Sequence, residues 1–123
     1  MAVLAPTSDR DIRSDWDKLQ GAWISIAGPR PARLLIAGHR FTFEFLGGAI
    51  YMGTFELANG QMDMHIETGP AQHVGCCSQC IYRLEGGLLR WCPGKPGSSQ
   101  RPSSFPDVDD PRYLSLVFRR DKR

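Results

Sequence analysis

Hydrophobic and polar positions repeat with a helical period near the start of the chain. Ile12, Trp16 and Leu19 are spaced by three or four residues, so they fall on one face of a helix. We therefore predict one short amphipathic helix over residues 9–20, preceded by a flexible leader over residues 1–8. The apolar face of this helix needs another part of the protein to cover it.

From residue 21 onward the period changes to two, which is typical of a strand with one buried face. Phe41, Phe43 and Phe45, for example, alternate with polar side chains. Glycine and proline turns separate segments of this kind, which span residues 21–28, 32–38, 40–48, 49–60, 61–70, 77–87, 88–94 and 112–120. The polar stretch over residues 94–111 predicts a long loop before the last strand.

About eight short strands with turns at regular intervals predict an all-β protein. A meander of strands removes its exposed edges when it closes into an up-and-down barrel. We therefore predict an antiparallel barrel over residues 21–120, within a single domain over residues 9–123. A length of 123 residues suits one domain. An eight-stranded barrel holds either packed side chains or one small ligand.

Composition narrows the class of protein further. A hydrophobic fraction of 41% and a charged fraction of 23% are typical of a soluble globular protein. The net charge of +2 is too small to indicate a nucleic-acid partner. The sequence has no apolar run long enough to span a membrane and no signal peptide. We therefore expect a cytoplasmic protein whose four cysteines are reduced thiols.

Six short motifs occur in a fixed order along the chain. They are D-x-L-Q-G-x-W at 17–23, G-T-x-x-L at 53–57, Met-Asp-Met at 62–64, I-Y-x-L-x-G-x-x-L-R-x-C at 81–92, R-P-x-x-F at 101–105, and Arg120 in the last strand. Over residues 16–122 this series resembles a mostly uncharacterised family of small lipocalin-like bacterial domains, first catalogued in planctomycetes. The resemblance implies a calycin-type barrel that is closed at one end by Trp23 packed under Arg120. It implies no catalytic residues, because the family has no general catalytic signature.

The inward-facing positions of the predicted strands are rich in aromatic residues and methionine. The candidate pocket residues are Phe41, Phe43, Phe45, Tyr51, Phe55, Met62, Met64, Cys80, Tyr82 and Trp91. These side chains either fill the barrel or line an apolar pocket. If they line a pocket, the phenols of Tyr51 and Tyr82 are the candidate hydrogen-bonding groups, and also the candidate catalytic groups of an enzyme.

Three of the four cysteines lie in the sequence HVGCCSQC at residues 73–80. His73, Cys76, Cys77, Cys80 and Cys92 include the ligand types of a tetrahedral zinc site. However, Cys77 and Cys80 point to opposite faces if the segment is a regular strand. A redox pair usually begins a helix, whereas this one precedes a strand. We therefore predict no cofactor and keep zinc as a less favoured alternative.

Two acidic segments are more simply explained as exposed polar residues than as functional sites. Asp63, His65 and Glu67 alternate with apolar residues, so we expect them to face solvent rather than to act as an acid–base group. The acidic run at residues 107–110 lacks the ligand spacing of a calcium loop. We expect this run to be part of the polar loop.

These features favour a barrel that binds one small apolar or aromatic molecule, as a monomer or homodimer, without nucleic acid or membrane. A first alternative is a cofactor-independent enzyme of a biosynthetic pathway, of the cyclase or isomerase type, that folds its substrate in the same cup. A second alternative is a metal or redox module built on the cysteines. A third is an interaction domain with a solid interior.

Overall fold

The computed structural model describes residues 7–108, 110 and 114–121. It contains one α-helix, one short 3-10 helix and eight strands. In chain order these are α1 (Thr7–Leu19), β1 (Gly21–Ala27), β2 (Ala32–Ala37), β3 (Arg40–Phe45), β4 (Ile50–Ala58), β5 (Gln61–Thr68), η1 (Ala71–His73), β6 (Cys77–Glu85), β7 (Leu88–Cys92) and β8 (Leu116–Arg120).

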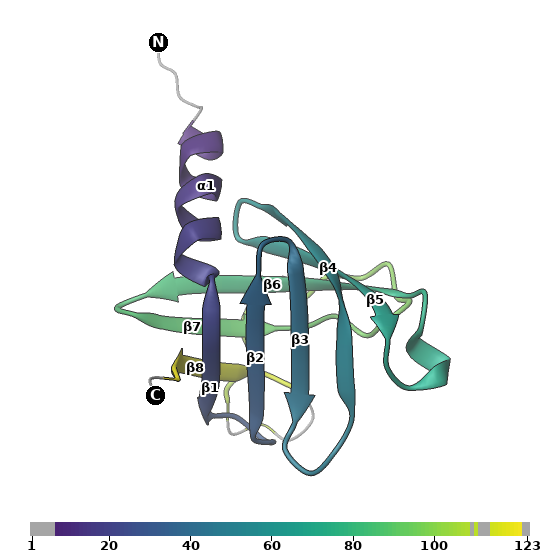
Figure 1. The fold of residues 1–123 in the computed structure, drawn as a ribbon. Helices are drawn as coiled ribbons and strands as arrows, with labels where there is room; N and C mark the ends of the chain where they lie inside the picture. Colours follow the sequence, from purple (N-terminus) through teal and green to yellow (C-terminus); the bar gives the residue numbers. More distant parts are fainter. Residues whose placement is uncertain (1–6, 109, 111–113, 122–123) are drawn as a thin grey trace.

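The eight strands form one closed barrel in sequence order, and every neighbouring pair is antiparallel (Figure 1). β8 closes the barrel by pairing with β1, where Trp23 lies opposite Arg120. The predicted all-β meander barrel with a short N-terminal helix is therefore confirmed. This topology is consistent with a calycin-like fold.

Strict alternation of side chains builds the interior. In β2, Ala32, Leu34 and Ile36 are buried, whereas the residues between them are exposed. Phe41, Phe43 and Phe45 of β3 are buried in the same way, as their period of two predicted. The inward-facing side chains of all eight strands form one continuous core.

The helix α1 and the ends of β1 and β8 close one end of the barrel. The Arg120 guanidinium lies 4.3 Å from the centre of the Trp23 ring, and it donates hydrogen bonds to the carbonyls of Gln20 and Lys18. The indole nitrogen of Trp23 donates to the carbonyl of Leu19 at 2.9 Å. The pairing of Trp23 with Arg120 that the resemblance implied is thus present.

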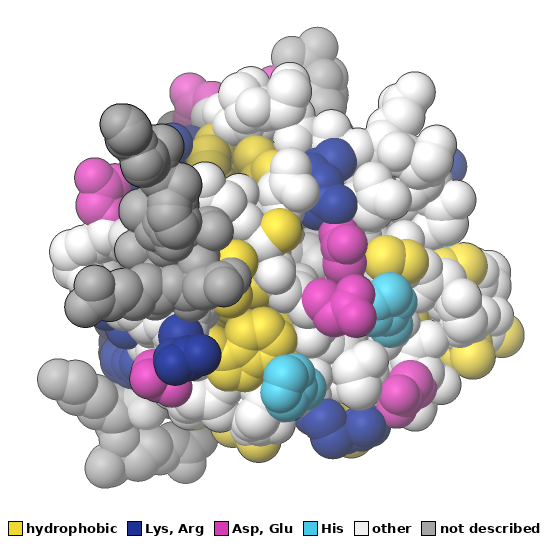
Figure 2. Space-filling view, turned by 90° about the horizontal axis from the view of Figure 1, so that it is seen from above, with side chains coloured by type: hydrophobic (Ala, Val, Ile, Leu, Met, Phe, Trp, Pro, Cys, Tyr) yellow, Lys and Arg dark blue, Asp and Glu magenta, His cyan; other side chains and the backbone are white. Residues whose placement is uncertain are grey.

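Two further contacts hold α1 against this end of the barrel. Gln20 exchanges two hydrogen bonds with the backbone of Gly38, in the turn between β2 and β3. The Trp16 ring stacks on Phe55 with ring centres 4.9 Å apart, and its indole nitrogen also donates to Gly38. Figure 2 views this end, where hydrophobic side chains lie near the middle of the face with histidine side chains beside them, and acidic side chains are spread over several parts of the face.

Two boundaries differ from those that the sequence predicted. The helix begins at Thr7, so it includes the last two residues of the predicted leader, and it ends at Leu19. The rest of that leader, residues 1–6, lies outside the described residues. The last strand begins only at Leu116, and residues 114–115 before it belong to no strand. Residues 112–113 of the predicted strand lie outside the described part.

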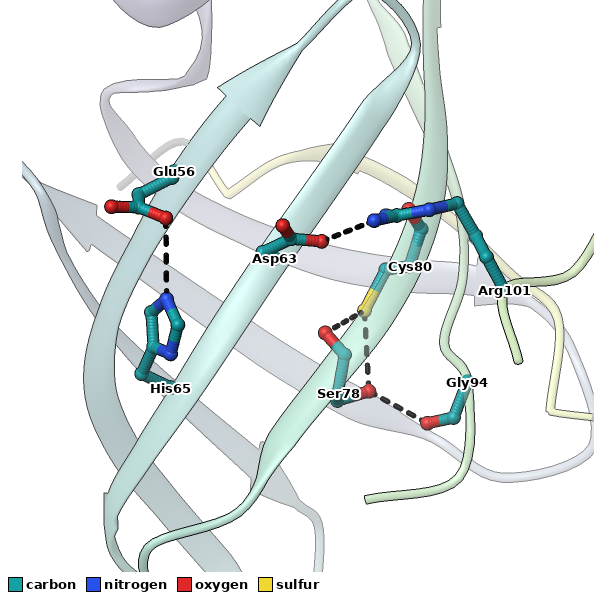
Figure 3. Close-up of polar contacts among 7 residues, drawn as sticks. All are labelled: Glu56, Asp63, His65, Ser78, Cys80, Gly94 and Arg101. Carbon is teal, nitrogen blue, oxygen red and sulfur yellow. Dashed lines mark hydrogen bonds and ion pairs between the residues drawn. The ribbon is translucent and has the colours of Figure 1, made fainter. Parts of the chain in front are cut away.

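Arg101 anchors the long loop between β7 and β8 to the outer wall of the barrel. The Arg101 guanidinium donates to the carbonyl of Cys80 at 2.8 Å and to the Asp63 carboxylate at 2.6 Å (Figure 3). The Phe105 ring lies near the guanidinium groups of Arg83 and Arg90, at 5.4 and 4.8 Å from its centre. The R-P-x-x-F motif is therefore a structural anchor.

Candidate ligand-binding cavity

The interior of the barrel is hollow at the end opposite α1. A cavity of about 230 Å³ opens there between the loops that follow β1, β5 and β7. Its lining residues are Arg30, Phe41, Phe43, Phe45, Tyr51, Met64, Ile66, His73, Ser78, Trp91, Pro93, Gly94, Pro96 and Leu114. An apolar cavity of roughly 150 Å³ is large enough for benzene. A molecule of one or two rings therefore suits this cavity in size.

Six of the ten candidate pocket residues line this cavity, namely Phe41, Phe43, Phe45, Tyr51, Met64 and Trp91. The other four belong to the packed half of the barrel near α1. Phe55 lies against Trp16, and Met62 lies opposite Cys80 in the pairing of β5 with β6. The Tyr82 hydroxyl donates to the Asp15 carboxylate of α1 at 2.6 Å. The two candidate phenols are thus in different places, and only Tyr51 is at the cavity.

Tyr51 and His73 form a polar pair in the cavity wall. The Tyr51 hydroxyl lies 2.9 Å from Nδ1 of His73, and the two rings stack with centres 5.8 Å apart. Tyr51 comes from β4, and His73 comes from the short helix η1 in the loop between β5 and β6. Each ring nitrogen or hydroxyl can donate or accept according to its protonation. The pair therefore offers a bound molecule either a donor or an acceptor.

Arg30 is the one residue among those lining the cavity that carries a permanent charge. It lies in the loop between β1 and β2, and its guanidinium is 3.8 Å from the centre of the Phe45 ring. A side chain at Gly48 would come within 3.3 Å of this guanidinium, so the glycine leaves room for it. Within the described residues, no carboxylate forms an ion pair with Arg30. Among the residues that the structure describes, no aspartate or glutamate lines the cavity.

Trp91 contributes an aromatic side chain to the cavity wall, and its indole N–H is buried. Its side chain is only 4% exposed and packs against Phe43, with ring centres 4.9 Å apart. The indole N–H has no hydrogen-bond partner in the part of the chain that the structure describes. A buried donor without a partner costs about 1–3 kcal/mol.

Burial favours the neutral form of three of the four thiols. The buried Ser78 hydroxyl donates to the carbonyl of Gly94 at 2.6 Å and lies 3.3 Å from the Cys80 sulfur (Figure 3). Burial raises the pKa of the Cys80 thiol to about 12. Burial also raises the pKa of Cys77 and of Cys92. Neutral thiols are poor nucleophiles, so burial lowers the reactivity of these three cysteines.

The zinc candidates are not brought together. Cys80 is fully buried inside the barrel, whereas Cys77 lies on the outer side of β6, as the alternation of a strand predicted. The outward-facing Cys92 lies opposite Ile81, and the His73 ring contacts Tyr51. Among the described residues, no group of three histidine, cysteine or acidic side chains has the spacing to hold a metal ion.

The polar row on β5 lies on the outer wall of the barrel, as predicted. His65 lies 3.3 Å from the Glu56 carboxylate, and Glu67 accepts from Arg40 at 2.7 Å. The Asp63 carboxylate forms an ion pair with Arg101, the residue that anchors the long loop (Figure 3). None of the three residues lines the cavity.

Several cavity residues were not singled out by the sequence. Arg30, Pro93 and Pro96 lie in loops, where no period in the sequence indicates which way a side chain points. Leu114 was part of the predicted last strand, but it lies before the start of β8. Ser78, in contrast, shares its strand face with Cys80 and Tyr82, so alternation alone assigns it to the interior.

Comparisons of the chain with known protein families, with curated proteins and with solved structures found no match. The described residues include no helix that is both long and apolar enough to cross a membrane. Most motif residues build the frame of the barrel rather than the cavity. Gly53, for example, has no space for a side chain, because a Cβ atom there would lie 1.8 Å from the carbonyl oxygen of His65.

Proposed function

We propose that this protein binds one small, mostly apolar molecule in the open half of its barrel. The observation that carries the proposal is an apolar cavity in the open half of the barrel, walled mainly by aromatic and methionine side chains with few polar groups. Apolar walls with a few convergent polar groups are typical of ligand sites. Phe41, Phe43 and Met64 supply such walls, and the pair Tyr51–His73 supplies a polar group.

As part of this proposal, we place the chain in the small lipocalin-like bacterial family, and the series of six motifs supports that placement. The closure of the barrel by Trp23 and Arg120 agrees with it. A cytoplasmic location, a monomeric or dimeric state and the lack of a nucleic-acid partner remain predictions.

Methionine methyl signals test the proposal directly. Met64 lines the cavity, whereas Met62 is buried in the packed half and Met52 lies on the outer wall. We would titrate ¹³C-methyl-methionine protein with one- and two-ring aromatic probes and follow these signals by NMR. Saturable shifts of Met64, with Met62 and Met52 unchanged, support an internal site. Probes that shift no signal, or that shift only Met52, contradict it.

A second candidate function is cofactor-independent catalysis in the same cavity. The hydrogen bond between Tyr51 and His73 favours it, because such a pair can move a proton to or from a bound molecule. Mass spectrometry of denatured protein would identify any co-purified molecule, which would then be added back in excess. Conversion to an isomer that both Tyr51→Phe and His73→Gln abolish supports an enzyme. Recovery of the unchanged molecule supports a binding protein.

A further inference from the structure

The charged and polar groups of the cavity lie together at its mouth. Arg30 belongs to the loop after β1, Tyr51 to the start of β4 and His73 to the loop after β5. These loops are all at the end of the barrel opposite α1. The deeper walls come from residues without charge, such as Phe41, Phe43 and Met64. The cavity therefore has an apolar interior and a polar rim.

The rim groups form a connected series of contacts. The Arg30 guanidinium lies 3.8 Å from the centre of the Phe45 ring. The Phe45 ring lies edge-on to Tyr51, with centres 6.5 Å apart. The Tyr51 hydroxyl then lies 2.9 Å from Nδ1 of His73. One side of the mouth thus presents a guanidinium, a phenol and an imidazole.

The charge of this rim has one sign. Among the described residues, Arg30 lacks an ion-pair partner and no carboxylate lines the cavity. A guanidinium held over an aromatic ring retains its donors for a planar anion, and a carboxylate fits its fork. Resting on the proposed binding function, we infer that the ligand is a carboxylate of one or two rings. Its ring system lies among Phe41, Phe43 and Met64, and its carboxylate contacts Arg30 and the pair Tyr51–His73.

A pair of probes that differ only in charge tests this inference. 2-Naphthoate and 2-naphthamide have the same ring system and nearly the same shape, but only the first is an anion. A charge-assisted hydrogen bond at a partly exposed site favours the anion by about tenfold in affinity. We expect that preference in the wild-type protein, measured by titration of the Met64 methyl signal and by calorimetry.

The variant Arg30→Gln should abolish the preference by weakening naphthoate and leaving naphthamide unchanged. Arg33→Gln is the matched control, because it removes the same charge from an exposed position on the outer side of β2 and should keep the preference. Equal affinities for the two probes in the wild-type protein would overturn the carboxylate inference and leave the binding function intact. A preference that persists in Arg30→Gln would also overturn it. If neither probe shifts Met64, both the inference and the binding function fail.

Discussion

The guanidinium of Arg120, in the last strand, lies 4.3 Å from the centre of the Trp23 ring, in the first strand. The two residues are also register partners in the pairing of β1 with β8. The same guanidinium donates to the carbonyls of Lys18 and Gln20, at the end of α1. One side chain thus joins the first strand, the last strand and the helix that covers this end of the barrel.

We predict that Arg120→Lys lowers the free energy of unfolding by about 1–2 kcal/mol, because an ammonium group cannot make both forked hydrogen bonds while lying flat on the indole. Chemical denaturation followed by tryptophan fluorescence measures this change. Arg119→Lys is the control, since Arg119 is exposed on the same strand and should change stability little. Equal effects of the two substitutions would argue against a special role for Arg120.

The buried thiol of Cys80 should make the protein less stable in alkali. Burial raises the pKa of this thiol to about 12 from its ordinary value of 9.0. Between these values the unfolded chain loses the proton first, so its free energy falls relative to the folded state. Stability should therefore be complete below pH 9 and fall by up to about 1.4 kcal/mol per pH unit above it. Burial and the bond to Asp15 also raise the pKa of Tyr82, which adds to the loss above pH 10.

The variant Cys80→Ala tests whether the Cys80 thiol causes the loss of stability in alkali. The variant should lose about 1 kcal/mol at neutral pH from the small cavity, but it should show a shallower fall in alkali. Met62→Ala is the control, because this equally buried neighbour carries no titratable group and should lower stability by the same amount at every pH. Urea denaturation from pH 7 to pH 11 measures how the free energy of unfolding of each variant changes with pH. An unchanged slope in Cys80→Ala would mean that the thiol is not responsible.

Removal of the Arg101 anchor should free the long loop from the outer wall. Arg101 binds both Asp63 and the carbonyl of Cys80, and the loop lies beside the buried Cys92. In Arg101→Gln we expect alkylation of Cys92 to become at least severalfold faster, as measured by peptide-resolved mass spectrometry. Arg40→Gln breaks an exposed ion pair with Glu67 and should leave that rate unchanged. The anchor role is wrong if the two variants react alike.

The two tyrosines of the interior should behave differently on loss of their hydroxyl groups. Tyr82 donates to Asp15 in the closed half, so Tyr82→Phe should cost about 1 kcal/mol of stability and keep the affinity for 2-naphthoate. Tyr51 pairs with His73 at the cavity, so Tyr51→Phe should weaken that affinity severalfold. Calorimetry and thermal unfolding of both variants measure these effects. A loss of affinity in Tyr82→Phe alone would reverse the assignment.

Much of the fold follows from local rules in the sequence. The period of two in Phe41, Phe43 and Phe45 fixes which side of β3 faces inward, because successive side chains point to opposite faces. Glycine-rich turns set the number of strands, and closure follows because a meander otherwise has two unpaired edges. The helix was also predicted from the spacing of Trp16 and Leu19, although its start at Thr7 was not.

What the sequence alone determined is therefore the set of inward-facing residues and the order of the strands. Only the tertiary structure decided which of them surround a space. Phe43 and Phe55 both face inward, but Trp16 of α1 stacks on Phe55, whereas Phe43 lies at the open end. The loops that bring Arg30 and His73 to the mouth have no period. Their positions follow from the closed barrel, which brings together residues that are far apart along the chain.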